Sequence, residues 1–504
     1  MLQQLDTFVG PEVNWFALSP MLTLLGGALV LMLAGALTPT WPKGLYAFAT
    51  ATIAGAAGVL AMVQWDDITD NGTTTLVGGA IAYDTLSMFL TITICIGVIL
   101  VSMISDEYLR GTPNDGPEVY ALYLVAAIGG IVMASANDLI VLFLGLETLS
   151  LALYVLAASN RRSSESAESG IKYFVLGGFA SAFFLYGIAL VYGATGSTNI
   201  SEMVAALQNG VDPFGNESLA LAGIALLIVG LGFKVAAVPF HVWAPDVYQG
   251  APTPVTALMA SVGKAAAFAA MLRVLVIALP FYRDDWRPII WTLALVTLLV
   301  GSILAVVQNN VKRMLAYSSI SHAGFILVGV EAAAHGAGDA DPGPGMPAVV
   351  LYLILYSVLV IGSFAVVTVV SRNSGGDTSL DSFKGLARRR PMLALAFTVF
   401  LLAQAGVPFT SGFIAKFGVI QAAVEVDSYA IAIIAMVAAV VAAFLYLRIM
   451  ITMWTADPAD GAEPLVIPFS VGLAIVAAVA FTLIVGIIPG WLIDAADTVT
   501  AYAR

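Results

Sequence analysis

Five ionisable residues lie in the middle of long apolar stretches of this sequence: Glu147, Lys234, Lys264, His322 and Lys416. Carboxylates, amines and imidazoles are the groups that take up and release protons in proteins. A charge at the centre of a bilayer costs at least ~2.5–3.5 kcal/mol, so ionisable residues there normally face a bundle interior or a water-filled cavity. If the surrounding segments cross a membrane, the five residues predict a proton path.

The glutamate and the lysines of this set could tune each other. Burial in an apolar medium lowers the pKa of a lysine from ~10.4, and a nearby carboxylate raises it. A lysine under both influences can exchange protons, with the glutamate as a modulator. The structural alternative is a fixed buried ion pair, but such pairs add little net stability. Proton transfer is therefore the favoured role for Glu147, Lys234, Lys264 and Lys416.

His322 lies in a polar part of an otherwise apolar segment. Tyr317, Ser318, Ser319 and Ser321 come just before it. A lone histidine is more often a satisfied core residue, but histidine can also shuttle protons, and hydroxyl groups can extend such a chain. The polar neighbours favour a place for His322 in the path.

Two further residues, Lys172 and His241, are possible members of the path. Lys172 lies near the start of an apolar segment and could instead extend its ammonium group to the membrane surface. His241 directly follows Val-Pro-Phe at 238–240 and could take up protons or simply lie at the interface. Both alternatives stay open.

Other charged residues have simpler explanations. Arg273 and Arg448 lie toward the ends of apolar segments and are expected to be anchors at the membrane surface. Asp84 and Asp138 open two segments, where a carboxylate favours the first turn of a helix. His335 is expected in a loop.

The composition identifies the elements that must hold these residues. The 504 residues include only 20 Lys or Arg and 32 Asp or Glu, and 60% are hydrophobic. A soluble chain of this length would form about three domains, and too few charges exist to cover them. A β-barrel is excluded because barrel strands alternate polar and apolar residues, whereas these runs are continuously apolar. The chain is therefore predicted to be an all-α polytopic membrane protein.

Composition and motifs also limit the ligands. The single cysteine, Cys95, excludes a CxxC site, and three histidines leave little for a metal centre. No nucleotide-binding glycine motif is present. We expect no cofactor or metal on this chain, and the net charge of −12 argues against nucleic acid as a partner.

A helix that crosses ~30 Å of hydrocarbon needs about 20 apolar residues. Fourteen spans are predicted, at 14–38, 45–64, 83–105, 119–136, 138–158, 170–194, 219–243, 255–280, 287–308, 312–331, 346–371, 391–424, 428–454 and 464–488. The twelfth is too long for one straight crossing and carries Gly-Val-Pro-Phe-Thr-Ser-Gly at 406–412, so we expect a broken helix there.

The positive-inside rule orients these spans. One side carries eleven basic residues: Lys43, Arg110, Arg161, Arg162, Lys312, Arg313, Arg372, Lys384, Arg388, Arg389 and Arg390. The other side carries only Arg283, Arg287 and Arg504. Both termini are therefore predicted outside, with the loop 372–390 in the cytoplasm.

A weak internal repeat appears in spans 7 and 12. Residues 232–240 and 405–417 each combine Val-Pro-Phe with a buried lysine. The two spans are five apart, so the units would enter the membrane in opposite directions. Interrupted helices in matching positions are typical of ion-handling sites in inverted repeats, although a tripeptide can also recur by chance.

The predicted organisation is one transmembrane domain over 1–504. It consists of three N-terminal spans (14–105), a first inverted repeat (119–280, spans 4–8), a second (287–454, spans 9–13) and a last span (464–488). Spans 7 and 12 are the broken helices of the two repeats.

Three motifs resemble the antiporter-like membrane subunits of respiratory complex I, the NADH-quinone oxidoreductase. Residues 312–324 (KRMLAYSSISHAG) are similar to the signature of these subunits. Residues 232–248 resemble their broken seventh helix, and residues 146–151 (LETLSL) resemble their glutamate helix. The resemblance covers nearly the whole chain.

Among the L, M and N branches of this family, the sequence is most similar to N. L subunits carry a long lateral helix after the core, whereas this sequence stops at Arg504, soon after its last span. M subunits are expected to have a glutamate where this sequence has Lys416. The sequence Leu-Glu-Thr-Leu-Ser around Glu147 is also more similar to the N branch.

The resemblance implies a proton-translocating subunit of the membrane arm, driven by electron transfer from NADH to quinone elsewhere in the complex. Glu147 and Lys234 would form an interacting pair, Lys264 and His322 would belong to a central polar axis, and Lys416 would lie toward the exit. Lys172 matches a lysine of the N branch. The cofactors, FMN, iron–sulfur clusters and a quinone, would lie in other subunits. The expected partners are the M and L subunits, the small K, J, A and H subunits and the lipid of a bacterial-type plasma membrane.

Two alternatives were weighed. The chain could belong to a multi-subunit sodium/proton antiporter, which is related but independent of redox chemistry. It could also be a polytopic scaffold or lipid-handling protein, but that role does not require five ionisable residues at membrane depth.

Overall fold

The computed structural model describes residues 13–38, 41–42, 44–110, 112, 115–208, 217–339, 343–458 and 465–499. The first half of the chain forms α1 (Ser19–Leu37), α2 (Leu45–Asn71), β1 (Thr74–Leu76), β2 (Ile81–Tyr83), α3 (Thr85–Leu109), α4 (Pro117–Ser135), α5 (Leu139–Ala157), α6 (Ser164–Thr195), α7 (Ile200–Gln208), α8 (Glu217–Val235), α9 (Trp243–Gly250), α10 (Thr253–Leu258), the π-helix η1 (Met259–Gly263), α11 (Lys264–Met271) and the π-helix η2 (Leu272–Ala278).

The second half forms the 3₁₀ turn η3 (Pro280–Tyr282), α12 (Arg283–Val306), α13 (Val311–His335), α14 (Gly345–Asn373), the 3₁₀ turn η4 (Leu380–Phe383), α15 (Leu386–Arg389), α16 (Pro391–Ala405), α17 (Ser411–Glu425), α18 (Tyr429–Thr455), α19 (Phe469–Ile487) and α20 (Gly490–Asp497). Within the described residues, 13 helical segments are long and apolar enough to cross a membrane. The all-α polytopic prediction is confirmed.

The predicted spans lie where the helices are found, but several helices begin or end at other residues than predicted. Span 12 is divided between α16 and α17. The predicted second span ended at 64, but α2 continues to Asn71, and α6 begins at Ser164, six residues before the predicted span. The hairpin of β1 and β2 and the short helix α7 were not predicted from the sequence. Lys43 and Arg504, used for the orientation, lie outside the described residues, and the orientation itself stays a prediction.

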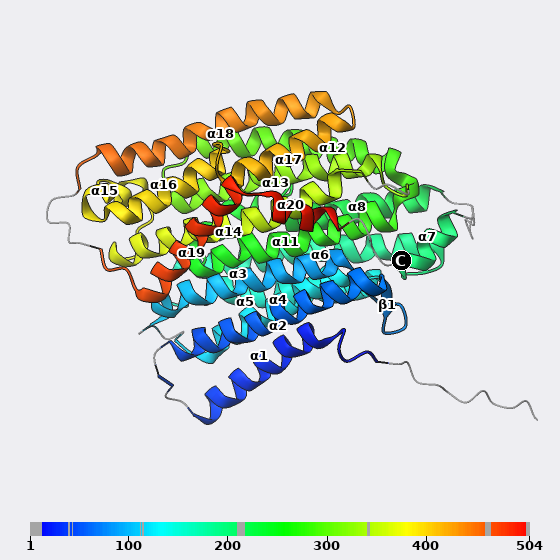
Figure 1. Ribbon diagram of the computed structural model, residues 1–504, viewed down its shortest axis with the longest axis horizontal. Coiled ribbons are helices and arrows are strands. Elements are labelled where there is room, and N and C mark those ends of the chain that lie inside the picture. The colour runs from blue at the N-terminus through cyan, green and yellow to red at the C-terminus, as the bar shows by residue number, and fades with distance from the viewer. Residues whose placement is uncertain are drawn as a thin grey trace, which may run out of the picture.

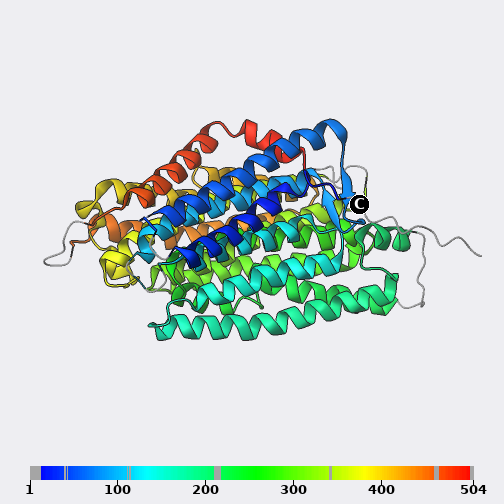
Figure 2. The ribbon, with the colours of Figure 1, turned by 90° about the horizontal axis from the view of Figure 1, so that it is seen from below.

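The long helices lie side by side in a bundle, with α18 at one edge and α1 at the other in Figure 1. Seen from below, α6 forms one border and α19 lies at the opposite border (Figure 2). The segment Thr253–Ala278 and α14 are buried along their whole apolar length, whereas α1 and α6 are mostly exposed. The exposed side chains of α6 include Phe174 and Phe179. Apolar residues therefore face both the core and the lipid, as in other membrane bundles.

Two helices are interrupted where the sequence places Val-Pro-Phe. At the end of α8, Ala236 has φ +60°, the N–H of Ala237 donates to the carbonyl of Gly232, and α9 begins only at Trp243. This is a Schellman ending, in which a left-handed residue closes the last turn. It leaves Lys234 at the end of the first half-helix.

The break between α16 and α17 is built in the same way. Gly406 has φ +91°, and the N–H of Val407 donates to the carbonyl of Leu402. The two breaks differ in register, because Val-Pro begins two residues after the left-handed residue in the first and one residue after it in the second. Lys416 also follows its break, whereas Lys234 precedes its own. The breaks were expected; the inverted repeat and the division at 119–280 and 287–454 remain predictions.

Close backbone approach between α4 and α5 leads to a first prediction. A Cβ added to Gly129 would lie 2.4 Å from the backbone nitrogen of Leu149, so Gly129→Ala forces the two helices apart. We expect a lower unfolding temperature of the purified protein in detergent, because backbone atoms cannot yield as a flexible side chain can. Gly178→Ala on α6, where a Cβ meets nothing within 4 Å, is the matched control and should leave it unchanged. Equal unfolding temperatures for the two variants would contradict this account.

Candidate functional site

Lys234 is held at the end of α8 by polar and aromatic groups of α5 and α6. Its Nζ donates to Ser150 Oγ at 2.6 Å and lies 3.5 Å from Tyr173 Oη. The same Nζ is 5.4 Å from the ring centroid of Tyr173 and 5.7 Å from that of Tyr154. These contacts orient the ammonium group without placing a negative charge on it.

Glu147 lies one helical turn before Ser150 on α5. Its carboxylate accepts a hydrogen bond from Ser181 of α6, and the residue is half-buried. Among the described residues no ion pair within 4 Å joins Glu147 to Lys234; Ser150 occupies the contact position. A cavity of about 10 Å³ between α5, α6 and α8 is lined by Ser181 and Lys234, which is room for about one water molecule. The carboxylate therefore acts on the lysine across a short distance.

Lys264 opens α11, directly after the π-helix η1, and is 3% exposed. Its Nζ donates to the backbone carbonyl of Ser319 on α13 and lies 5.6 Å from the ring centroid of Tyr356. The π-helical turn on each side of α11 widens the helix locally, a feature found at functional sites. The lysine thereby reaches the polar stretch of α13.

His322 is the centre of a network of hydroxyl groups in the core. Its Nδ1 is 2.6 Å from Tyr352 Oη, and its Nε2 is 3.4 Å from Tyr446 Oη. Tyr446 Oη is 2.6 Å from Ser318 Oγ, which donates to Gln404 Oε1 at 3.2 Å. Every member is buried. The network can relay a proton because each group both donates and accepts.

Lys416 lies just after the break between α16 and α17. Its Nζ donates to the carbonyl of Ala405 at 3.2 Å, and the ring centroid of Phe325 is 4.7 Å from Nζ. Ala405 is the last residue of α16, so its carbonyl carries the negative end of the helix dipole. The break thus supplies the partner that an unbroken helix would keep for itself.

The five predicted residues fall into two groups. Lys264, His322 and Lys416 are joined through α13: the ring of Tyr356 lies against both Lys264 Nζ and the ring of His322, whose centroid is 4.7 Å away. Glu147 and Lys234 form a separate group. A run of aromatic rings leads from this group into the core, because Tyr173 stacks on Trp243 at 4.6 Å and Trp243 contacts Tyr248 at 6.1 Å.

The possible path residues lie nearer to one face. Lys172 is 39% exposed and pairs with Asp246 at 2.7 Å, which also pairs with Arg313 at 2.6 Å. These residues line a polar cavity of about 210 Å³ together with Glu165, Glu168, Ser169, Gln249 and Gly250. Partial burial would raise the pKa of Asp246, but its hydrogen bonds to Lys172 and Arg313 and their charges outweigh this and lower it. His241 is half-buried in the turn before α9, and its Nδ1 has no hydrogen-bond partner within the part of the chain that the structure describes.

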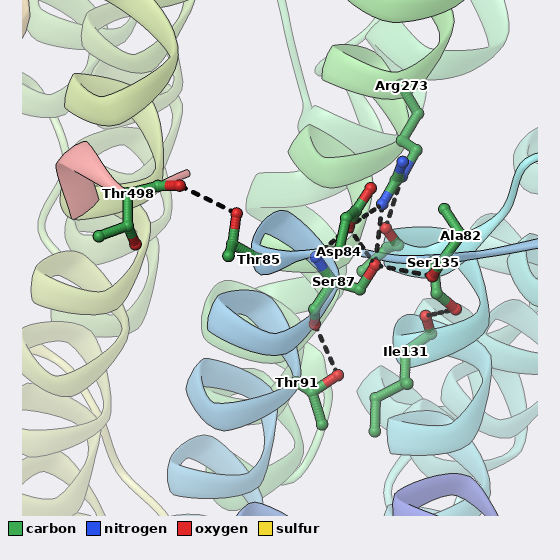
Figure 3. Close-up of polar contacts among 10 residues, drawn as sticks. Ala82, Asp84, Thr85, Ser87, Thr91, Ile131, Ser135, Arg273 and Thr498 are labelled. Carbon is green, nitrogen blue, oxygen red and sulfur yellow. Dashed lines mark hydrogen bonds and ion pairs between the residues drawn. The ribbon is translucent and has the colours of Figure 1, made fainter. Parts of the chain in front are cut away.

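The prediction for Arg273 was wrong. It is fully buried and pairs with Asp84 at 2.7 Å, and it also donates to Ser87 Oγ and to the carbonyl of Ala134 (Figure 3). Asp84 caps α3 as expected, accepting from the N–H of Ser87. The segment-end position of Arg273 suggested lipid contact because a sequence does not reveal which helices cover its ends. Asp138 caps α5 as expected.

Four further residues differ from the simple sequence interpretation or were not identified. Lys312, counted among the loop residues, is 4% exposed and donates to the carbonyl of Ala251. His335 is the last residue of α13 rather than a loop residue. Tyr352 and Gln404 were missed, since a single tyrosine or glutamine in an apolar run gives little signal. Among the described residues, no group of three His, Cys, Asp or Glu side chains could hold a metal ion.

The buried pair leads to a second prediction. Asp84→Asn should destabilise the protein by about 3–5 kcal/mol, because it leaves the Arg273 guanidinium buried without its counter-charge. The double variant Asp84→Asn/Arg273→Met should lose less, because no charge remains. Thermal unfolding of the purified protein measures both, and a double variant less stable than Asp84→Asn would contradict the argument.

Comparison with known proteins gives consistent similarities. The family model described as NADH:quinone oxidoreductase/Mrp antiporter, TM matches residues 136–442. NADH-quinone oxidoreductase subunit N of Rhodococcus opacus (strain B4) is 39% identical and covers 100% of this chain and 99% of its own length. The subunit of the same name from Mycobacterium tuberculosis (strain ATCC 25618 / H37Rv) is 38% identical, with 98% and 99% covered.

Solved structures share the architecture. A chain of respiratory complex I from Thermus thermophilus with bound Aureothin has a TM-score of 0.77 and 31% identity, and the match covers 94% of this chain and 98% of that one. A chain of the Mrp complex from Dietzia sp. DQ12-45-1b has a TM-score of 0.83 at 21% identity, over 97% and 96% of the two chains. The second similarity shows the fold alone.

Proposed function

The chain belongs to the NADH-quinone oxidoreductase subunit N family, and from this premise we propose that its buried lysines and histidine carry the protons that the complex translocates. It is a multi-pass subunit of the membrane arm in a bacterial plasma membrane. The complex couples proton translocation to electron transfer from NADH to quinone, which takes place in other subunits.

One observation carries the residue assignment. Lys234, Lys264 and Lys416 are 8%, 3% and 5% exposed, and within the described residues none has a carboxylate within ion-pair distance. Their partners are hydroxyls, backbone carbonyls and aromatic faces. A buried ammonium without a counter-charge pays a desolvation cost that the neutral amine avoids. Such lysines are suited to alternate between the two forms as a proton passes.

Glu147 acts as the modulator of this exchange. When its carboxylate is charged, the field favours the ammonium form of Lys234; when it is neutralised, the proton is released toward the core. Because Ser181 donates to the carboxylate and Ser150 accepts from the ammonium group, the two charged groups need not form a fixed ion pair. The hydroxyls around His322 then relay the proton between Lys264 and Lys416.

Proton uptake is assigned to the polar cavity of Lys172, Asp246 and Arg313. It opens on the face that the basic residues predict to be cytoplasmic. Its lining includes Asp246, Gln249 and Gly250 of α9, the helix that follows the broken end of α8. His241, in the turn before α9, lies between the cavity and that break in sequence and stays a candidate for the same step.

The remaining assignments rest on the family and on sequence. We expect FMN, iron–sulfur clusters and a quinone in other subunits, and the M, L, K, J, A and H subunits as neighbours. Both termini are proposed to lie outside, with residues 372–390 in the cytoplasm. A sodium/proton antiporter subunit is the second candidate; it is less supported, since the Mrp similarity extends to the fold alone.

The assignment of Glu147 and Lys234 predicts a loss of pumping. Glu147→Gln or Lys234→Ala should lower NADH-driven proton uptake into inverted membrane vesicles by roughly tenfold, because each removes a group that exchanges or controls the proton. Electron transfer from NADH to ferricyanide should remain, since it does not require proton translocation.

Exposed residues of the same type serve as controls. Glu202→Gln and Lys384→Ala remove equivalent charges outside the core, and both should pump normally. Full pumping by an assembled complex that carries Lys234→Ala would reject the proposed path, and co-purification with only small membrane subunits would favour the antiporter.

A further inference from the structure

Glu331 is a buried carboxylate in the last turns of α13 that the path described above does not use. It is 2% exposed. Its Oε1 accepts from Ser428 Oγ at 3.0 Å, and its Oε2 is buried with no hydrogen-bond partner among the described residues. A carboxylate near a helix C-terminus also faces the negative end of the dipole. Buried polar atoms are normally paired, so an orphaned carboxylate oxygen needs an explanation.

His335 links this carboxylate to the surface. It follows Glu331 by one helical turn, its Nε2 lies 3.3 Å from Glu331 Oε1, and its side chain is 27% exposed. Arg287 Nη1, which can only donate, lies 3.2 Å from Nδ1 and 3.1 Å from Nε2. In the neutral tautomer that carries its hydrogen on Nδ1, Nε2 can accept, and this nitrogen also faces Glu331 Oε1.

The position of the pair relative to the path is set by α13. Phe325, whose ring covers Lys416 Nζ, lies six residues before Glu331, a rise of about 9 Å along the helix. The interval is closed by tight packing, since a Cβ on Gly329 would lie 3.0 Å from a methyl group of Val419 on α17. Glu331 is therefore the next ionisable group on α13 beyond Lys416 toward the end of the helix, separated from it by an apolar layer.

We propose that Glu331 and His335 form a proton-release relay at the end of α13 that the basic residues predict to be outside. This inference rests on the proposed function, because it needs protons to arrive from Lys416. A proton that crosses the apolar layer binds Oε2 and converts the carboxylate into a carboxylic acid. Rotation of the carboxyl group presents this proton to the lone pair of His335 Nε2. The resulting imidazolium releases one proton to water, so His335 is neutral again and Glu331 is again a carboxylate.

The surrounding groups fit a relay better than a purely structural contact. Ser428 and His335 both contact the same oxygen, so they leave the other one available to an incoming proton. Arg287 and Arg283 hold the end of α13 in place, with Arg283 donating to the carbonyls of His335 and Ala337. The end of α13 is thus fixed by the two arginines, and Oε2 of Glu331 is the carboxylate oxygen that remains without a hydrogen-bond partner among the described residues.

The test uses the assembled complex in inverted membrane vesicles. Glu331→Gln keeps the size and the hydrogen bond from Ser428 but cannot bind a proton, so proton uptake driven by NADH should fall by roughly tenfold. NADH oxidation by ferricyanide should be unchanged. Glu331→Asp, which restores a carboxyl group, should recover part of the pumping. A merely structural role would not distinguish the amide from the shorter acid in this way.

Two further variants decide the remaining outcomes. Glu425→Gln removes an exposed carboxylate on α17 outside the cluster and is the matched control; if Glu331→Gln pumps as well as this control, the relay is overturned. Should Glu331→Gln prevent assembly, His335→Gln tests the same relay, and normal pumping by that variant also overturns it. If Lys234→Ala loses pumping and Glu331→Gln pumps normally, the relay alone is rejected. If both variants pump normally, the proposed function is rejected as well.

Discussion

The structure depends on the cost of holding an ammonium group in an apolar interior without a negative partner. Three buried lysines share this condition, and each donates a hydrogen bond to a different neutral group. Lys234 donates to a hydroxyl, Lys264 to a carbonyl within a helix, and Lys416 to a carbonyl at a helix break. Weak partners keep the charged and neutral forms close in free energy. Strong counter-ions would fix one form and stop transfer. In the proposed function, this balance would let a proton enter the core and leave it again.

The interrupted helices follow from the same requirement. A continuous helix uses its interior carbonyls in its own hydrogen bonds, so it offers a lysine only a shared acceptor, as Ser319 does to Lys264. The Schellman endings of α8 and α16 satisfy some of the released groups internally and leave Ala405 to Lys416. The lysines lie on opposite sides of their breaks. The shared element is therefore the break itself rather than an aligned lysine.

The helices and the breaks could be predicted from the sequence because each depends on a local pattern, an apolar run and a proline in it. The burial of the three lysines and of His322 follows from their place in the middle of such runs, and their role in proton transfer stays a prediction. Prediction from the sequence failed where burial depends on a distant neighbour. Arg273 was predicted to be an anchor because it lies toward the end of its segment. Its buried ion-pair partner is Asp84, almost two hundred positions earlier in the chain. His335 was assigned to a loop for the same reason, and the burial of Lys312 at the start of its span was not predicted. Glu331 was not noticed, since it lies near the end of an apolar run where an acid usually reaches water.

The burial of α14 has a consequence for biogenesis. Its whole apolar length lies inside the protein, where it packs against α3 and α13 and also against α16, α17 and α19. The last three helices are synthesised after it. During translation, one side of α14 must therefore be solvated by lipid and later exchange that lipid for protein. Hydropathy suffices to insert such a helix. Its small and polar side chains can contact α16, α17 and α19 only after these helices have been inserted. The second half of the bundle is therefore completed around a helix that is already in the membrane.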